Sequence, residues 1–87
     1  MYFVKRNVEL SMENLVEIHI GHRIKEILDN KGMSVAEFSD KINYHRSNVY
    51  RLFDKRTIDI TLLIRISKVL DYNFFEEISI VVDDDLN

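Results

Sequence analysis

Residues 33–54 read MSVAEFSDKINYHRSNVYRLFD, and this stretch predicts two short helices joined by a tight turn. Ser34 and Glu37 have the spacing of a capping box, which marks the start of the first of these helices. Asn43 is expected to end it, because asparagine tolerates the left-handed backbone conformation that a tight turn needs. His45 then occupies the cap position of the second helix, which is predicted over residues 45–54.

The second of these helices is predicted to have one apolar side and one polar side. Val49, Leu52 and Phe53 form the inward stripe, which leaves the polar residues on the outer side. Such a polar helix face can enter the major groove of duplex DNA and read the edges of the base pairs. The residues expected to contact bases are Arg46, Ser47, Asn48 and Arg51. The residues expected to contact phosphates are Tyr44, His45, Tyr50, Lys55, Arg56 and Lys41.

Arg46 and Arg51 are the main candidates for reading bases, because one guanidinium can bond the O6 and N7 atoms of guanine together. A bidentate contact of this kind is worth roughly 1–3 kcal/mol of discrimination. Another interpretation places both arginines on a solvated surface or in ion pairs with Asp40 and Asp54. The surrounding pattern of caps and apolar positions favours DNA contact.

The charge balance limits how the chain could bind nucleic acid. Its 87 residues make one small domain, with no room for a separate effector-binding domain, and the formal net charge is −3. Residues 45–56 nevertheless hold four Lys and Arg residues against Asp54, a net charge of +3, which leaves −6 for the rest of the chain. Any DNA contact must therefore come from this local patch.

Further helices are expected on both sides of the central stretch. Apolar residues at helical spacing predict a helix over residues 18–31, with Gly32 as its C-cap. Asp59 takes the cap position of a largely apolar helix, and Asn73 is expected to start a short last helix.

The two ends of the chain are less regular. Residues 2–10 and 78–82 are rich in β-branched and aromatic side chains, so both are predicted as short strands. The chain divides into an N-terminal extension (1–17), a helix-turn-helix domain (18–79) and an acidic C-terminal tail (80–87). Because the sequence has no cysteine and no apolar run of membrane-spanning length, we expect a cytoplasmic protein without disulfides or membrane contact.

The order of these features over residues 20–78 resembles the Cro and phage-repressor type of helix-turn-helix domain, also called the XRE family. The resembling segments are residues 20–24, 32–42, 46–52, 63–70 and 73–74. The resemblance implies an all-α, lambda-repressor-like domain of five helices, in which the second and third helices bind DNA, and it implies operator binding as a homodimer. The sequence departs from the family pattern at Val35, which replaces a phosphate-binding glutamine, and at Asn43 and Lys55, which replace glycines.

We therefore expect a sequence-specific transcriptional regulator, most simply a repressor that binds a near-palindromic operator as a homodimer. The expected dimer interface consists of apolar residues of the last two helices: Leu62, Val69, Phe75 and Ile80. An alternative is an antitoxin or adaptor that uses the same fold to bind a partner protein.

No set of residues points to catalysis, a cofactor or a metal. The acidic residues of the C-terminal end are paired with no nucleophile and no glycine-rich phosphate loop. His19 and His22 have the spacing of two metal ligands, but no third ligand is obviously placed. We expect no enzyme activity and no cofactor, and the expected partners are double-stranded DNA, a second copy of the chain or another protein.

Overall fold

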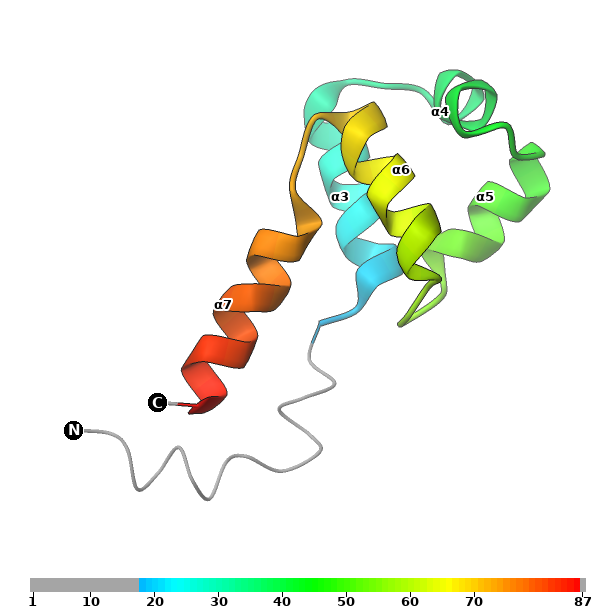
Figure 1. Cartoon of the computed structure of the whole chain (residues 1–87). Helices are drawn as coiled ribbons and strands as arrows, with labels where there is room; N and C mark the ends of the chain where they lie inside the picture. The colour runs from blue at the N-terminus through cyan, green and yellow to red at the C-terminus, as the bar shows by residue number, and fades with distance from the viewer. Residues whose placement is uncertain (1–17, 87) are drawn as a thin grey trace.

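The computed structural model describes residues 18–86, and this part of the chain consists of five helices and no strand (Figure 1). The helices are α3 (Ile20–Lys31), α4 (Val35–Ile42), α5 (Arg46–Phe53), α6 (Ile60–Leu70) and α7 (Phe74–Leu86). None of them is both long enough and apolar enough to cross a membrane. The predicted all-α fold of five helices is confirmed for the described residues.

Side-chain caps start the helices where the sequence predicts. Ser34 Oγ accepts the N–H of Glu37 at 3.0 Å at the start of α4, and Asp59 Oδ2 accepts the N–H of Leu62 at 2.9 Å at the start of α6. Each cap satisfies a backbone donor that the first turn of a helix leaves without a helical partner. Asn43 has a φ of 61°, so the predicted left-handed turn between α4 and α5 is confirmed.

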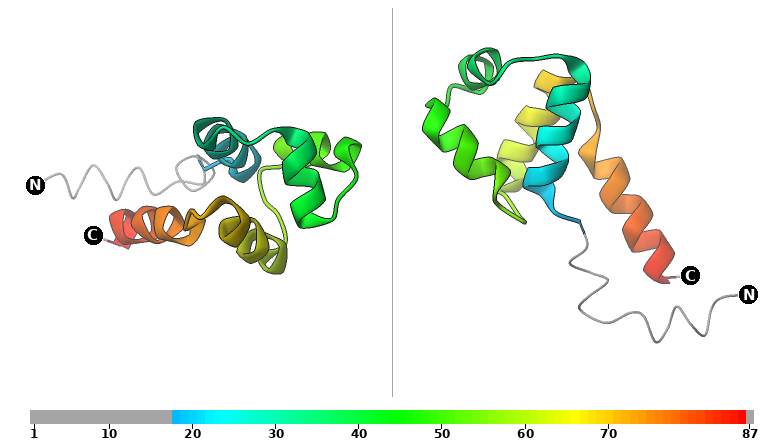
Figure 2. Two further views of the ribbon diagram at one scale, coloured as in Figure 1. Left: turned by 90° about the horizontal axis from the view of Figure 1, so that it is seen from above. Right: turned by 180° about the vertical axis from the view of Figure 1, so that it is seen from behind.

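One apolar core holds the helices together. Figures 1 and 2 show α3 and α6 side by side, with α4 and α5 on one side of this pair and α7 on the other. Phe38 of α4, Val49 of α5 and Ile66 of α6 are fully buried in the core, and Phe74 adds the first turn of α7. Burying a side chain of this size contributes about 1.5–3 kcal/mol, so these contacts fix how the short helices α4 and α5 sit on the body.

Gly21 lets the start of α3 pack directly against the end of α5. Its N–H donates to Lys55 O at 2.8 Å, and the N–H of Ile20 donates to Arg56 O at 3.0 Å. A Cβ atom on residue 21 would lie 2.4 Å from Phe53 O, so only glycine fits there without a backbone shift. The junction attaches the segment that follows α5 to the body of the protein.

A polar cluster ties α7 to α3. Arg23 Nε donates to Glu77 Oε1 at 3.0 Å, and Arg23 Nη2 and Tyr72 OH both donate to Glu77 Oε2. The hydrogen bonds from Arg23 lower the pKa of Glu77. The hydrogen bond to the Glu77 carboxylate raises the pKa of Tyr72. The cluster therefore favours an ionised Glu77 beside a neutral Tyr72.

The C-terminal end differs from its prediction. The strand predicted over residues 78–82 is wrong, because these residues lie within α7, which runs for 13 residues and is not a short helix. Asn73 Oδ1 starts α7 by accepting, at 3.0 Å, the N–H two residues further on. Phe74, Ile78 and Val81 then place buried or half-buried side chains along one side of α7 at helical spacing. Burial along one helix face outweighs the β-propensity of these residues.

The division of the chain into an extension, a domain and a tail stays a prediction. α7 passes through residue 80 without a break, and Asp83 and Asp84 are exposed on its last turns. The extension over residues 1–17, with the strand predicted at residues 2–10, lies outside the described residues.

Candidate DNA-binding surface

α5 turns its polar side away from the body of the protein. Val49, Leu52 and Phe53 are buried on the inner side, with exposed fractions of 0%, 3% and 7%. This confirms the inward stripe that the sequence predicts. The four residues expected to contact bases are all exposed: Arg46, Ser47, Asn48 and Arg51. Since α5 begins at Arg46, they occupy its first two turns.

The residues expected to contact phosphates surround this helix. Tyr50 lies on α5 and is 55% exposed, whereas Tyr44 in the preceding turn is half-buried and packs against the core. Three cations of this set, and one histidine, are also exposed: Lys41, Lys55, Arg56 and His45. The structure thus brings all six predicted phosphate contacts to α5 itself or to the chain on either side of it.

No acid of the described residues is paired with either arginine of α5. Among the residues that the structure describes, neither Arg46 nor Arg51 takes part in an ion pair. Their pairing with Asp40 or Asp54 is therefore not observed in this part of the chain. An exposed guanidinium without a carboxylate partner can still donate its forked hydrogen bonds to a base or a phosphate.

Arg65 of α6 holds the end of α4 in place. Its Nη1 donates to Ile42 O at 2.8 Å, and this carbonyl is among those that the last turn of α4 leaves without a helical partner. The N–H of Tyr44 donates to Ser39 O at 2.8 Å and closes the turn. Sequence reasoning did not identify this role of Arg65, because no local pattern shows which carbonyl a long side chain will reach from another helix.

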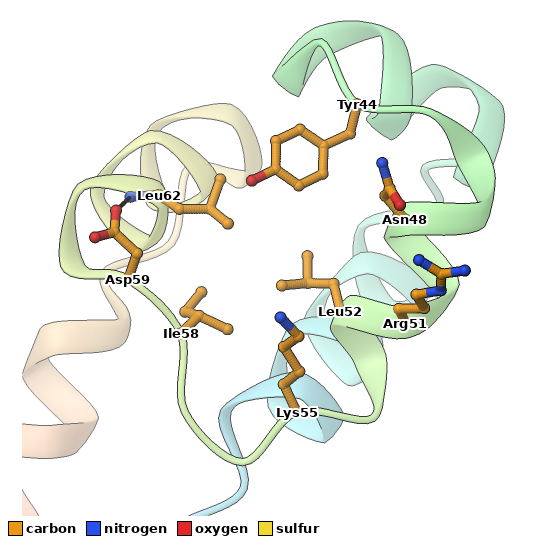
Figure 3. A pocket seen from close by; sticks show the side chains of 8 residues that line it. All are labelled: Tyr44, Asn48, Arg51, Leu52, Lys55, Ile58, Asp59 and Leu62. Carbon is orange, nitrogen blue, oxygen red and sulfur yellow. Dashed lines mark hydrogen bonds between the residues drawn. The ribbon is translucent and has the colours of Figure 1, made fainter.

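A groove separates α5 from the start of α6 (Figure 3). Its volume is about 370 Å³. Figure 3 shows the side chains of Tyr44, Leu52 and Lys55 pointing into it. The lining residues are Tyr44, Asn48, Arg51, Leu52, Lys55, Ile58, Asp59 and Leu62. Two predicted base contacts and two predicted phosphate contacts therefore share one hollow on the α5 side of the molecule.

Two histidines act as helix caps. His45 Nδ1 accepts the N–H of Ser47 at 3.3 Å and lies 2.9 Å from Ser47 Oγ, so His45 has the predicted cap position of α5. His19 Nδ1 accepts the N–H of His22 at 3.1 Å at the start of α3, and the two rings stack with centroids 3.5 Å apart. The spacing of His19 and His22 is thus that of a cap and the donor it satisfies. Within residues 18–86, no three potential metal ligands lie together.

The comparison with protein families agrees with this geometry. A helix-turn-helix family model matches residues 24–76, from the middle of α3 to the first turn of α7. The chain belongs to the helix-turn-helix family. It is of the XRE, or Cro and phage-repressor, type, with a lambda-repressor-like fold whose helix-turn-helix is α4 and α5. No curated protein and no solved structure matches the chain.

Membership in the helix-turn-helix family indicates a sequence-specific DNA-binding regulator. Two departures from the family pattern have a structural account in this helix-turn-helix protein. Asn43 adopts the left-handed conformation itself, and Lys55 has no positive φ, so neither position requires glycine. Val35, the first residue of α4, is half-buried against the core, so α4 begins without a side-chain hydrogen-bond donor at this position.

Proposed function

We propose that this helix-turn-helix protein is a transcriptional repressor that occupies a near-palindromic operator as a homodimer. α5 enters the major groove, and Arg46 and Arg51 read bases there, with Ser47 and Asn48 beside them. The observation that supports this proposal best is the exposed, cationic side of α5 on a body with an excess of acidic residues. The charge segregation orients the molecule, because the acidic remainder is repelled by DNA and the α5 side is attracted.

Phosphate contacts on both sides of α5 would position the helix in the groove. Lys55 and Tyr44 lie at the groove between α5 and α6, next to Asn48 and Arg51. Phosphate contacts set the register of a protein on the duplex but do not read its sequence. The same role is proposed for four further residues: Lys41, His45, Tyr50 and Arg56.

The small size of the α5 surface supports the homodimer. One copy with a single reading helix makes few contacts, whereas two copies reading half-sites about 34 Å apart would restore affinity. The residues proposed for the interface differ in exposure: Leu62, Val69 and Phe75 are half-buried against the core, whereas Ile80 is 57% exposed. Leu62 also lines the groove beside α5, which leaves the α7 side of the molecule as the better surface for a second copy.

The test is a selection of bound duplexes from a random pool at a stated salt concentration, followed by binding of the selected site and of random duplex. Arg46→Ala and Arg51→Ala should each reduce the preference for the selected site by roughly 5- to 150-fold per half-site, the equivalent of one bidentate base contact in each copy. Lys68→Ala is the matched control, because Lys68 is an exposed cation at the far end of α6, beside Asp71 and Tyr72. It should leave both affinities unchanged.

Two results would contradict the proposal. If the arginine variants lost affinity equally for both duplexes, the arginines would be phosphate contacts and not base readers. If no sequence were enriched from the pool, the helix-turn-helix would not serve operator recognition.

The second candidate function is that of an antitoxin or adaptor that binds a partner protein. The favouring observation is apolar surface on α6, where Ile60 is 65% exposed and Ile64 is 42% exposed, on a chain of net charge −3. A small toxin encoded by the neighbouring reading frame, and a stable complex of the two co-expressed chains, would support this candidate. Loss of that complex in an Ile60→Ser variant that still binds the operator would separate the two functions.

A further inference from the structure

α7 bears an apolar stripe that begins at the core and continues past it. Phe75 and Ile78 are half-buried and pack against the core, whereas Val82 is 48% exposed and Leu86 is 78% exposed. The four residues are spaced by three, four and four, so they lie along one side of the helix. No residue that the structure describes buries the second half of this stripe, Val82 and Leu86.

The start of α3 lies at the same end of the molecule as the second half of α7. Arg23 and Glu77 are level with each other, and the two helices run in opposite directions (Figures 1 and 2). Nine residues of α7 follow Glu77, roughly 13 Å of helix, whereas α3 has three residues before Arg23, roughly 4–5 Å. The last two turns of α7 therefore extend beyond α3, at the end where the chain before Ile18 is attached.

The first residues of the chain complement this surface in charge and in hydrophobicity. Residues 1–8 read MYFVKRNV, which combines apolar side chains with two cations and no acid. α7 has five acidic residues and neither Lys nor Arg. Glu76 and Asp83, seven residues apart, flank the apolar stripe on one side, and both are exposed.

We propose that residues 1–8 bind the second half of α7 of the same chain, with Phe3 and Val4 covering Val82 and Leu86 and with Lys5 and Arg6 facing Glu76 and Asp83. Residues 9–17 can span up to about 30 Å, more than twice the length of the exposed part of α7. A segment tethered this closely has an effective concentration on the order of millimolar, so it competes well with a separate molecule for the same stripe. Ile80 points to the opposite side of α7 and stays open to a second copy.

The test uses a spin label on an Asn7→Cys variant, which is uniquely labelled because the chain has no cysteine. The label should cause loss of amide signal intensity in residues 79–86, while residues 35–42 of α4 keep theirs. Phe3→Ser with Val4→Ser should abolish the loss. As a second measurement without any label, this double variant should speed hydrogen exchange of the last turns of α7.

Charge reversal supplies the specificity control. Lys5→Glu with Arg6→Glu should abolish the signal loss, and Glu76→Lys with Asp83→Lys on that background should restore it. The matched control, Lys41→Glu with Lys68→Glu, changes the net charge equally but away from the second half of α7, and it should have no effect.

Three outcomes would overturn the proposal. The first is no signal loss in residues 79–86 together with unchanged hydrogen exchange in the Phe3→Ser and Val4→Ser variant. The second is a signal loss that survives both the apolar and the charge substitutions. The third is a signal loss in a mixture of isotope-labelled chains without the spin label and spin-labelled chains without the isotope, because the bound segment would then belong to another copy.

Discussion

Gly21 allows the start of α3 to approach the end of α5 closely. Alanine normally favours a helix over glycine by about 0.5–1 kcal/mol, so Gly→Ala in α3 would stabilise an isolated helix. Here the added Cβ would lie 2.4–2.7 Å from three backbone oxygens, and none of them can move alone. Gly21→Ala should therefore lower the free energy of unfolding by about 1–3 kcal/mol. The measurement is urea denaturation.

The prediction is tested by whether Gly21→Ala lowers or raises the free energy of unfolding. A gain in stability on Gly21→Ala would mean that α3 and α5 are not in close backbone contact. Gly32→Ala is an informative comparison, because Gly32 has a φ of 72° and no atom within reach of a Cβ. That variant should be strained only by its own backbone conformation, at a cost of about 1 kcal/mol.

Glu77 makes the stability of the protein depend on pH. Its pKa is lowered by the hydrogen bonds from Arg23, so the folded state holds the ionised carboxylate more strongly than the unfolded state does. The contribution of Glu77 is present above the unfolded pKa of about 4.5 and is lost as the pH falls through the lower folded pKa. Glu77→Gln should therefore flatten the loss of stability below pH 4.5, in thermal or urea unfolding measured against pH. If the Glu77→Gln variant lost stability below pH 4.5 as steeply as the unmodified protein, that result would contradict the Arg23–Glu77 ion pair.

Between elements, one side chain of α6 adds a hydrogen bond to the core contacts that position α4. Arg65 Nη1 donates to Ile42 O, so its removal leaves a partly buried carbonyl without its charged partner. Arg65→Met should lower the free energy of unfolding by about 1–3 kcal/mol and reduce binding to operator and random duplex together, because α5 loses its fixed position. Lys68→Met, one turn further along α6, should stay within about 0.5 kcal/mol. Equal effects of both substitutions would argue against a role of the Arg65–Ile42 hydrogen bond in holding α4.

Element boundaries were predictable where the signal is local. Four residues act as caps or turn residues within three positions of their partners: Ser34, Asn43, His45 and Asp59. Their roles can therefore be predicted from the sequence alone. α7 shows the opposite case. Ile, Val and Ser at residues 78–82 have the composition of a strand, and only the packing of one side of the helix against the body decides the outcome.

At the scale of the whole molecule, the local charge should set the salt dependence of DNA binding. The observed affinity falls with salt by a slope of about 0.9 for each phosphate contact that releases a counterion. Lys55→Ala should therefore reduce the slope of log Kobs against log salt by about 0.9 per copy bound and weaken operator and random duplex alike. The check is a salt titration of both duplexes with Lys68→Ala as the control. A slope that is unchanged by Lys55→Ala would remove Lys55 from the phosphate contacts.

Most of the candidate site was visible in the sequence, because the inward stripe of α5 determines which residues face outward. The long-range contacts that hold the surrounding helices in place could not be predicted. Arg65 reaches a carbonyl 23 residues away in sequence, and the Arg23–Glu77 bonds join residues 54 apart. No pattern within one helix encodes contacts of this range, since they depend on where the other helices pack.

The amino-acid sequence by itself determined helices α3 to α6 with the caps at Gly32, Ser34, His45 and Asp59, the polar and apolar sides of α5, and the net charge of +3 at residues 45–56. These properties follow from interactions between residues that are near neighbours in the chain. Only the tertiary structure decided that glycine is needed at residue 21, that α6 clamps α4, and that α7 extends as one helix past α3. The physical reason is that steric exclusion, long-range hydrogen bonds and burial all depend on the distances between elements. These distances are not fixed until the core has formed.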